Sequence, residues 1–253
     1  MFPTRRALCV WRRDLESWKR FAPSFFIAAL SEPIFYLLGI GYGLGRFVTS
    51  FGGVPYAVFL APGIVAFAAM NSATFETTIG AYTRMVEQRT YAAILATPCS
   101  VADIVAGDVL WAASKSVLAA SLVLVLCVIF HLVRGVLALL VLPFAFLVGL
   151  MFGALGMVVT ARAPSYDFFN YYFSLVFSVM FLFSGVFFPL ESLPAWGQWL
   201  AWVMPLTHAV RVCRALTTPT SGDPLAGSLL WIVTATALAF VAAERLVRRR
   251  IQV

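Results

Sequence analysis

The sequence predicts an all-α membrane protein that crosses the bilayer several times. The chain has 253 residues, of which 62% are hydrophobic and 11% are charged, whereas a soluble domain has about 45–50% apolar and about 25% charged residues. Its apolar residues form runs close to the length that a spanning helix needs, about 20 residues. The net charge of +7 comes from Lys and Arg gathered at the ends of these runs. This placement favours orientation signals and anionic lipid over nucleic acid as the reason for the charge.

Residues 4–20 are expected to form an amphipathic helix on the membrane surface. One apolar face is predicted from spacings of three and four, and it consists of Leu8, Trp11, Leu15 and Trp18. Basic residues run beside it: Arg5, Arg6, Arg12, Arg13, Lys19 and Arg20. Tryptophans that face acyl chains, with basic side chains reaching water beside them, are typical of an interfacial helix.

Six spans are predicted after this helix, with short connections, so residues 1–253 are expected to form one membrane domain. The spans lie near residues 24–45, 56–79, 108–131, 136–160, 168–188 and 225–243. The third helix is expected to begin earlier, at Val101, and to protrude into the cytoplasm. Pairs of glycines four residues apart predict close helix packing, and these are Gly39/Gly43, Gly41/Gly45 and Gly149/Gly153.

The distribution of Lys and Arg predicts that both termini are cytoplasmic. In this orientation the outside holds only Arg46, Arg134, Arg211 and Arg214, while the amino-terminal segment, Arg84, Arg89, Arg162 and the carboxy-terminal arginines lie inside. A thiol reagent that does not cross membranes is therefore expected to reach Cys213, or a cysteine placed at Ser221, from outside. It is expected not to reach Cys99.

The segment 82–100 is the most polar internal part of the chain, and it must reach water because long apolar runs flank it. Tyr91 to Ala96 is predicted to form a short helix that ends at Thr97-Pro98, since a residue before proline leaves the α region. Ser100 is expected to cap the next helix, with Asp103 at the capping-box position. Two interpretations stay open: a solvated loop and a docking site for a soluble partner.

The segment 189–224 is too short for a domain and too apolar for a free loop. A short helix bounded by Pro194 and Pro205 is predicted to carry three indoles, those of Trp196, Trp199 and Trp202. The next predicted helix, 206–216, carries His208 and Arg214. Both helices are expected to dip into the outer leaflet, where indoles lie at the level of the headgroups. They serve either as an anchor or as an outer gate.

Four ionisable residues are predicted within the membrane: Glu32, Glu76, Asp108 and Lys115. Such groups are costly in lipid, so they are either functional or paired between helices. A Glu32–Lys115 ion pair is one expectation, since both residues are predicted at similar depth. Motifs for hydrolysis or nucleotide binding do not occur, and the cysteine spacing does not suit zinc. The chain is thus expected to have no catalytic, cofactor or metal site of its own.

Several motifs together resemble the ABC-2 family of exporter permeases. They are Phe183-Ser-Gly-Val-Phe-Phe-Pro189, Leu193-Pro194, Pro205-Leu-Thr-His208-x5-Arg214, and the stretch from Arg84 to Leu95-Ala-Thr-Pro98. Within the family, Ala-Thr-Pro followed by Gly107-Asp-Val-Leu-Trp111-Ala-Ala is similar to the nodulation protein J branch. Members of that branch export lipo-chitooligosaccharides with a separate ATPase. Arg89 stands where many members of the family carry glycine.

The resemblance implies a permease homodimer in the bacterial inner membrane, bound to two copies of an ABC ATPase that hold ATP and Mg. The implied substrate is an amphiphilic, glycolipid-like molecule. The residues implied to couple to the ATPase are Arg84, Glu87, Arg89, Tyr91, Leu95, Thr97 and Pro98. Those implied to form the outer gate are Trp196, Trp199, Trp202, His208 and Arg214.

Two further classes of function are weighed against an ABC permease. An ion-coupled secondary transporter would use Glu32, Glu76, Asp108 and Lys115, but such transporters usually show internal repeats and paired broken helices, which this sequence does not. A membrane enzyme that acts on lipid is disfavoured because no catalytic constellation is evident. The sequence therefore favours an ABC exporter permease.

Overall fold

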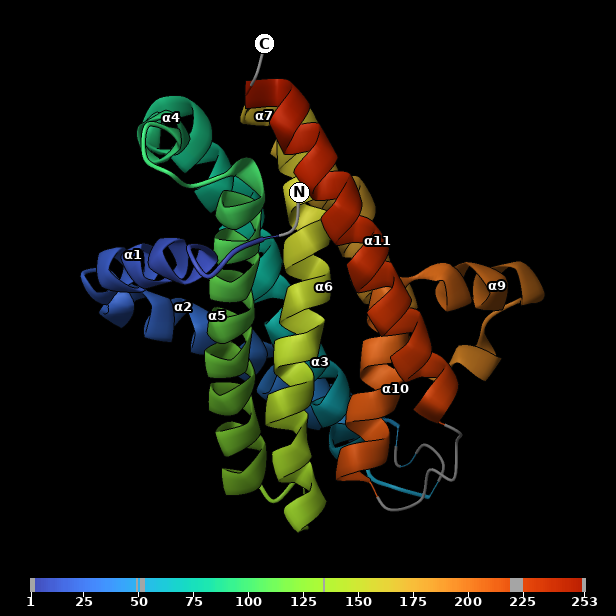
Figure 1. Cartoon of the computed structure of the whole chain (residues 1–253). Coiled ribbons are helices and arrows are strands. Elements are labelled where there is room, and N and C mark those ends of the chain that lie inside the picture. The colour runs from blue at the N-terminus through green and yellow to red at the C-terminus, as the bar shows by residue number, and fades with distance from the viewer. Residues whose placement is uncertain (1–2, 49, 51–52, 134, 219–224, 252–253) are drawn as a thin grey trace.

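The computed structural model describes residues 3–48, 50, 53–133, 135–218 and 225–251. Helices dominate this part of the chain (Figure 1). In order they are α1 (Ala7–Lys19), α2 (Ala22–Phe35), η1 (Tyr36–Gly43), η2 (Leu44–Arg46), α3 (Tyr56–Phe75), η3 (Glu76–Gly80), η4 (Thr83–Glu87), α4 (Thr90–Leu95), α5 (Val101–Ile129), η5 (Val136–Leu140), α6 (Val141–Arg162), α7 (Asp167–Tyr171), η6 (Tyr172–Phe177), α8 (Ser178–Phe183), η7 (Leu190–Ser192), α9 (Ala195–Val203), α10 (Pro205–Thr217) and α11 (Leu225–Ile251).

Five helical segments of the described chain are long and apolar enough to cross a membrane. They are Ala22–Arg46, Tyr56–Glu87, Val101–Ile129, Val136–Arg162 and Leu225–Ile251. The predicted class, an all-α polytopic membrane protein, is therefore confirmed. The sixth predicted span corresponds to Asp167–Phe183, which is apolar but shorter than the other five. A count of six spans stays a prediction.

The segment Tyr56–Glu87, which begins with α3, lies at the centre of the molecule. In the most apolar 18-residue stretch of this segment, 78% is buried inside the molecule. The corresponding share is 17% for both Ala22–Arg46 and Leu225–Ile251. α5, α6 and α11 run alongside one another in front of it (Figure 1). The first and last spans thus leave most of their apolar surface facing outward, which suits lipid or another chain.

Close approach of α5 and α6 depends on Gly149. A Cβ atom at this position would lie 2.6 Å from Ala113 Cα and 2.7 Å from Ser116 Oγ. The Ser116 hydroxyl is held in place by hydrogen bonds to Ala69 O at 2.8 Å and Ala112 O at 3.0 Å. Gly153 continues the contact against Ala112. By contrast, no heavy atom of the described chain would lie within 4 Å of a Cβ at Gly39, so the first span shows only part of the expected packing.

Helix α1 lies across α5 (Figure 1) and buries a face different from the one that the sequence predicts. The buried residues are Ala7, Val10 and Asp14. Val10 packs directly against Gly107 of α5: a Cβ atom added to Gly107 would lie only 2.5 Å from the Cβ of Val10. Trp11 Nε1 donates to Ser114 Oγ at 3.0 Å. Trp11 and Trp18 thus also contact α5, Trp18 through its ring packing against Trp111, and their contact with acyl chains stays a prediction.

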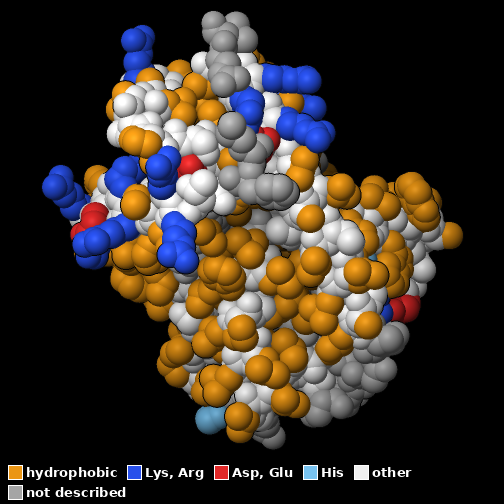
Figure 2. Space-filling model, viewed as in Figure 1, with side chains coloured by type: hydrophobic (Ala, Val, Ile, Leu, Met, Phe, Trp, Pro, Cys, Tyr) orange, Lys and Arg blue, Asp and Glu red, His pale blue; other side chains and the backbone are white. Residues whose placement is uncertain are grey.

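Lys and Arg side chains gather over α1, over α4 and over the last turns of α11, and the rest of this face is largely apolar (Figure 2). We call this part of the molecule the basic end.

Cys213 of α10 is only 2% exposed, so the expected labelling of Cys213 is wrong: it lies on a helix that packs against α3. Arg134 and Ser221 lie outside the described residues.

We predict that Gly149→Ala lowers the stability of the folded chain, because its methyl group would meet Ala113 and Ser116 in a packed core. Overpacking of this kind costs about 1–3 kcal/mol. The matched control is Gly227→Ala on α11, where a Cβ would meet nothing within 4 Å. The measurement is the thermal aggregation temperature of each variant in detergent. Equal values for the two variants would contradict the packing argument.

Candidate functional site

The predicted docking segment forms an exposed helical turn at the basic end. α4 (Thr90–Leu95) begins after Arg89, whose φ of 51° lies in the left-handed region. Glycine adopts this conformation without cost, whereas the arginine at this position adopts it with some strain. Ser100 and Asp103 form the predicted capping box at the start of α5. The predicted break between two helices is thus confirmed.

The structure separates the predicted coupling residues into two groups. Glu87, Arg89, Thr97 and Pro98 are exposed. Leu95 is half-buried and packs against a cluster that includes Val101 and Val105. Arg84 and Tyr91 point inward, Tyr91 being buried. These two residues therefore hold the segment in place, and the exposed group is free to meet a partner.

Arg84 joins two carboxylates that the sequence places in separate spans. Its Nη1 donates to Glu76 Oε1 at 2.6 Å, and its Nη2 lies 3.4 Å from Asp108 Oδ2. Lys115 Nζ donates to the other oxygen of Glu76 at 2.7 Å. The expected Glu32–Lys115 pair is therefore wrong, because Glu76 lies close enough to take both cations.

Glu32 forms its own links within the membrane. Its carboxylate accepts hydrogen bonds from Tyr36 Oη at 3.0 Å and from Asn71 Nδ2 at 3.2 Å. It thus joins α2 to α3. The four ionisable residues predicted within the membrane all have polar partners in the described chain, and Glu32 lies apart from the other three.

Helix α1 contributes two more members to this network. Arg13 Nη2 lies 2.5 Å from Asp14 Oδ1 and 3.9 Å from Asp108 Oδ1. Asp14 Oδ1 also lies 3.9 Å from Arg84 Nε. The Tyr91 hydroxyl donates to Asp108 Oδ2. We call the whole set the charge cluster: Arg13, Asp14, Glu76, Arg84, Tyr91, Asp108 and Lys115.

The charge cluster holds three carboxyl groups and three cationic groups, so its charges can balance. Ion pairs buried in this way are costly to break, because removing one partner leaves an uncompensated buried charge at about 3–5 kcal/mol. The cluster therefore fixes α1, η3, η4, α4 and α5 relative to one another. A push on α4 reaches α5 directly through the hydrogen bond from Tyr91 to Asp108.

Two oxygens within the charge cluster have no hydrogen-bond donor among the described residues: Asp14 Oδ2 and Asp108 Oδ1. Burial and the neighbouring carboxylate of Asp108 raise the pKa of Asp14 to about 8, against the lowering effect of Arg84 and Arg13. A proton held by Asp14 facing Asp108 provides the donor that these oxygens lack. Asp14 thus holds its proton to a higher pH than an ordinary aspartate does.

The amino-terminal segment is also fastened to the loop that follows α4. Thr4 donates to Asp103 Oδ1 through its backbone nitrogen at 2.5 Å and through its hydroxyl at 2.8 Å. The Arg6 guanidinium donates to the carbonyl of Pro98. Movement of the docking segment is therefore coupled to α1 at two points, namely this loop and the charge cluster.

At the other end of the bundle, the motif residues bind backbone carbonyl groups. Arg214 Nη2 donates to Gly185 O at 2.9 Å and to Phe59 O at 3.4 Å, and its guanidinium lies 4.0 Å from the centre of the Phe59 ring. Gly185 has a φ of 75°, in the left-handed region. Arg214 thus holds the turn after α8 against α3 and α10.

His208 joins the short helices to the last span. Its Nε2 lies 2.9 Å from Trp202 O, its Nδ1 lies 3.3 Å from Ser228 Oγ, and its ring stacks on Trp231. Trp196, Trp199 and Trp202 lie on α9 and are exposed, and α9 projects from the side of the bundle (Figure 1). Their predicted role as a gate stays a prediction.

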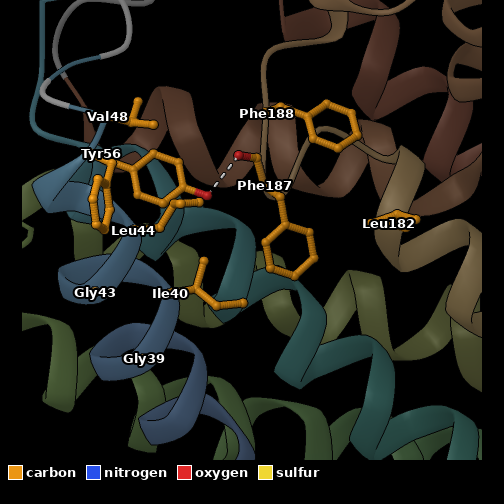
Figure 3. A pocket seen from close by; sticks show the side chains of 10 residues that line it. Gly39, Ile40, Gly43, Leu44, Val48, Tyr56, Leu182, Phe187 and Phe188 are labelled. Atoms are coloured by element: carbon orange, nitrogen blue, oxygen red, sulfur yellow. Dashed lines mark hydrogen bonds between the residues drawn. The ribbon is translucent and has the colours of Figure 1, made fainter.

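An apolar cavity of about 690 Å³ opens between η1 and the motif turn. Its wall includes Ile40, Leu44, Leu182 and Phe187, and Tyr56 Oη donates to Phe187 O at 3.0 Å (Figure 3). Gly39 and Gly43 line it from η1 (Figure 3). The cavity suits apolar chains, since its walls offer few polar groups.

The chain belongs to the ABC-2 type transporter family, which matches residues 6–217. It is therefore the membrane subunit of an ABC transporter, and its family implies an ABC ATPase as partner.

Three of its relatives are named nodulation protein J. The one from Rhizobium leguminosarum bv. viciae is 40% identical over 96% of this chain and 94% of the relative. The one from R. leguminosarum bv. trifolii is 43% identical over 83% and 80%. The one from Bradyrhizobium diazoefficiens is 38% identical over 96% and 92%.

Sequence reasoning missed the part that Arg13 and Asp14 play in the charge cluster. The signal was present in the spacing of Ala7, Val10 and Asp14, which puts one carboxylate on the same helical face as two small apolar residues. An acid on such a face, amid a run of basic residues, indicates a buried partner on another helix.

We predict that Asp14→Asn keeps the fold at neutral pH and removes part of its pH dependence. The folded-state pKa of about 8 lies above the ordinary value of 3.8, so the folded state binds more protons between these values. The stability contributed by Asp14 is therefore present at low pH and is lost as the pH rises through about 8. The measurement is the melting temperature of both proteins in detergent from pH 5 to 9. A variant with the same pH slope as the parent protein would contradict the assignment.

Proposed function

We propose that this chain is the permease subunit of an ATP-driven exporter in the bacterial inner membrane. Two copies form a homodimer, and each binds one ABC ATPase subunit that carries ATP and Mg. The basic end is cytoplasmic, in agreement with the excess of Lys and Arg expected on that side. The substrate is an amphiphile with a lipid and a carbohydrate part, of the lipo-chitooligosaccharide kind.

One observation carries this proposal: α4 presents an exposed face at the basic end while its Tyr91 is locked to α5. Ala92 and Ala93 are exposed on α4, as are Thr97 and Pro98 after it. A partner that grips this face moves α5 with it, because Tyr91 donates to Asp108 in the buried charge cluster. This arrangement suits transmission of force from an ATPase to the spans.

The substrate class rests on the apolar cavity and on the relatives. The cavity next to η1 accepts an acyl chain, since its walls are almost wholly apolar. The relatives carry the name nodulation protein J, which is the branch that the sequence motifs resemble. The exposed indoles of α9 act as the outer gate in this proposal, with His208 and Arg214 holding the helices behind them.

We predict that the double variant Glu87→Arg with Ala93→Pro loses its ATPase partner while its spans still fold. Glu87→Arg reverses an exposed charge, and proline at 93 removes the hydrogen bond from Ala93 N to Arg89 O. For the charge reversal alone we expect a loss of a few kcal/mol at most, as for close charge pairs at interfaces. The measurement is the amount of cognate ATPase that co-purifies with the tagged chain.

Two comparison variants make this experiment specific. Glu191→Arg reverses an exposed charge on η7, away from α4, and is expected to keep the ATPase. Arg84→Ala is expected to reduce the folded yield itself, because it leaves the carboxylates of Glu76 and Asp108 without their shared cation. Normal capture of the ATPase by the double variant would overturn the proposed docking site.

We predict that Ser192→Cys reacts with an impermeant thiol reagent added to intact cells, whereas Glu87→Cys reacts only after permeabilisation. Both positions are exposed in the structure, and the orientation follows from the Lys and Arg distribution. The background lacks Cys9, Cys99, Cys127 and Cys213. Labelling of Glu87→Cys in sealed cells would reverse the proposed orientation.

A further inference from the structure

A second cavity lies at the basic end, next to the charge cluster. It has a volume of about 760 Å³ and opens between α1, the α1–α2 junction, η3, η4 and α5. We call it the inner pocket. Its size falls within the range of small-molecule sites. Because α1 is amphipathic and lies across α5 at the basic end (Figure 1), the pocket opens where the proposed orientation puts the inner-leaflet headgroups.

The buried charged groups on the wall of the inner pocket lie next to groups of opposite charge, while Arg20 and Glu16 line it from exposed positions. Lys115 and Arg84 both bind Glu76, and Arg13 binds Asp14. An anionic headgroup would have to compete with these carboxylates for their cations. The wall therefore favours a neutral ligand that exchanges hydrogen bonds with paired charges.

Aromatic and uncommitted polar groups complete the lining. The Trp18 ring lies at the pocket, packed edge-on against Trp111 at 5.7 Å, and its buried Nε1 has no acceptor among the described residues. Ser17 and Gln88 line the pocket with exposed side chains, and Phe21 lies exposed at its edge. An indole face beside amide, hydroxyl and carboxylate groups suits a sugar ring, which has apolar C–H faces and hydroxyl groups at its rim.

We propose that the inner pocket binds the neutral sugar headgroup of the amphiphile before export, with the acyl chain left in the inner leaflet. This inference rests on the proposed function, because it specifies where that substrate is first recognised. The indole of Trp18 faces the sugar, and its Nε1 donates to a sugar hydroxyl. Arg84 and Lys115 line the pocket as members of the charge cluster, so an occupied pocket adjoins the groups that fix α4 to α5.

The test measures binding of an N-acylated chitotetraose to the full-length chain in phosphatidylcholine nanodiscs, without ATP. Ser17→Phe fills the pocket from an exposed position, and Trp18→Phe keeps a ring but removes the donor. We expect at least a tenfold loss of affinity for Ser17→Phe and a smaller loss for Trp18→Phe. The matched control is Phe35→Leu, an exposed aromatic on α2 outside the pocket, which should bind like the parent protein.

Each outcome decides the proposal. Unchanged affinity in both pocket variants overturns it, as does displacement of the probe by phosphatidylglycerol, which would identify an anionic headgroup site. Co-purification of the ATPase is scored separately on the same variants. Binding that fails while the ATPase complex forms and exports the probe refutes the inner pocket alone, whereas sugar binding without any ATPase complex refutes the proposed function.

Discussion

The position of Arg84 is the constraint on which the cytoplasmic half of the proposed arrangement depends. A guanidinium taken out of water needs compensating charge, and here Glu76 and Asp108 supply it from two different helices. Asp14 adds a third carboxyl group from α1. Because these ligands come from elements far apart in the sequence, neutralising one side chain fixes the relative positions of α1, η3, η4 and α5.

This constraint divides the docking segment into an inner and an outer surface. Tyr91 is buried and bound to Asp108, so α4 is not a free loop that becomes ordered only when a partner binds. Its exposed side consists of the small residues Ala92 and Ala93. A rigid attachment of this kind is a physical requirement for coupling, since a flexible segment would absorb the movement of an ATPase before it reached the spans.

The family motifs at the other end of the bundle have structural explanations of the same sort. Arg214 holds two carbonyl groups near a glycine with positive φ, and His208 joins Trp202, Ser228 and Trp231. Backbone carbonyls left by a broken helix need donors where water is scarce. These residues therefore position the short helices, and the exposed indoles of Trp196 and Trp199 on α9 are the part of this region best placed to contact lipid, substrate or another chain.

The sequence by itself determined the membrane class, most of the helix boundaries and the break between α4 and α5, because apolar length, proline and capping residues act locally. Five long spans, the start of α5 at Val101 and the bounds of α9 follow from such signals. Only the tertiary structure decided that Lys115 binds Glu76 instead of Glu32, that Arg84 and Tyr91 face inward, and that Asp14 belongs to the charge cluster. These outcomes depend on which helices become neighbours and on their rotation about their axes, and the near-uniform apolar surface of spanning helices specifies neither.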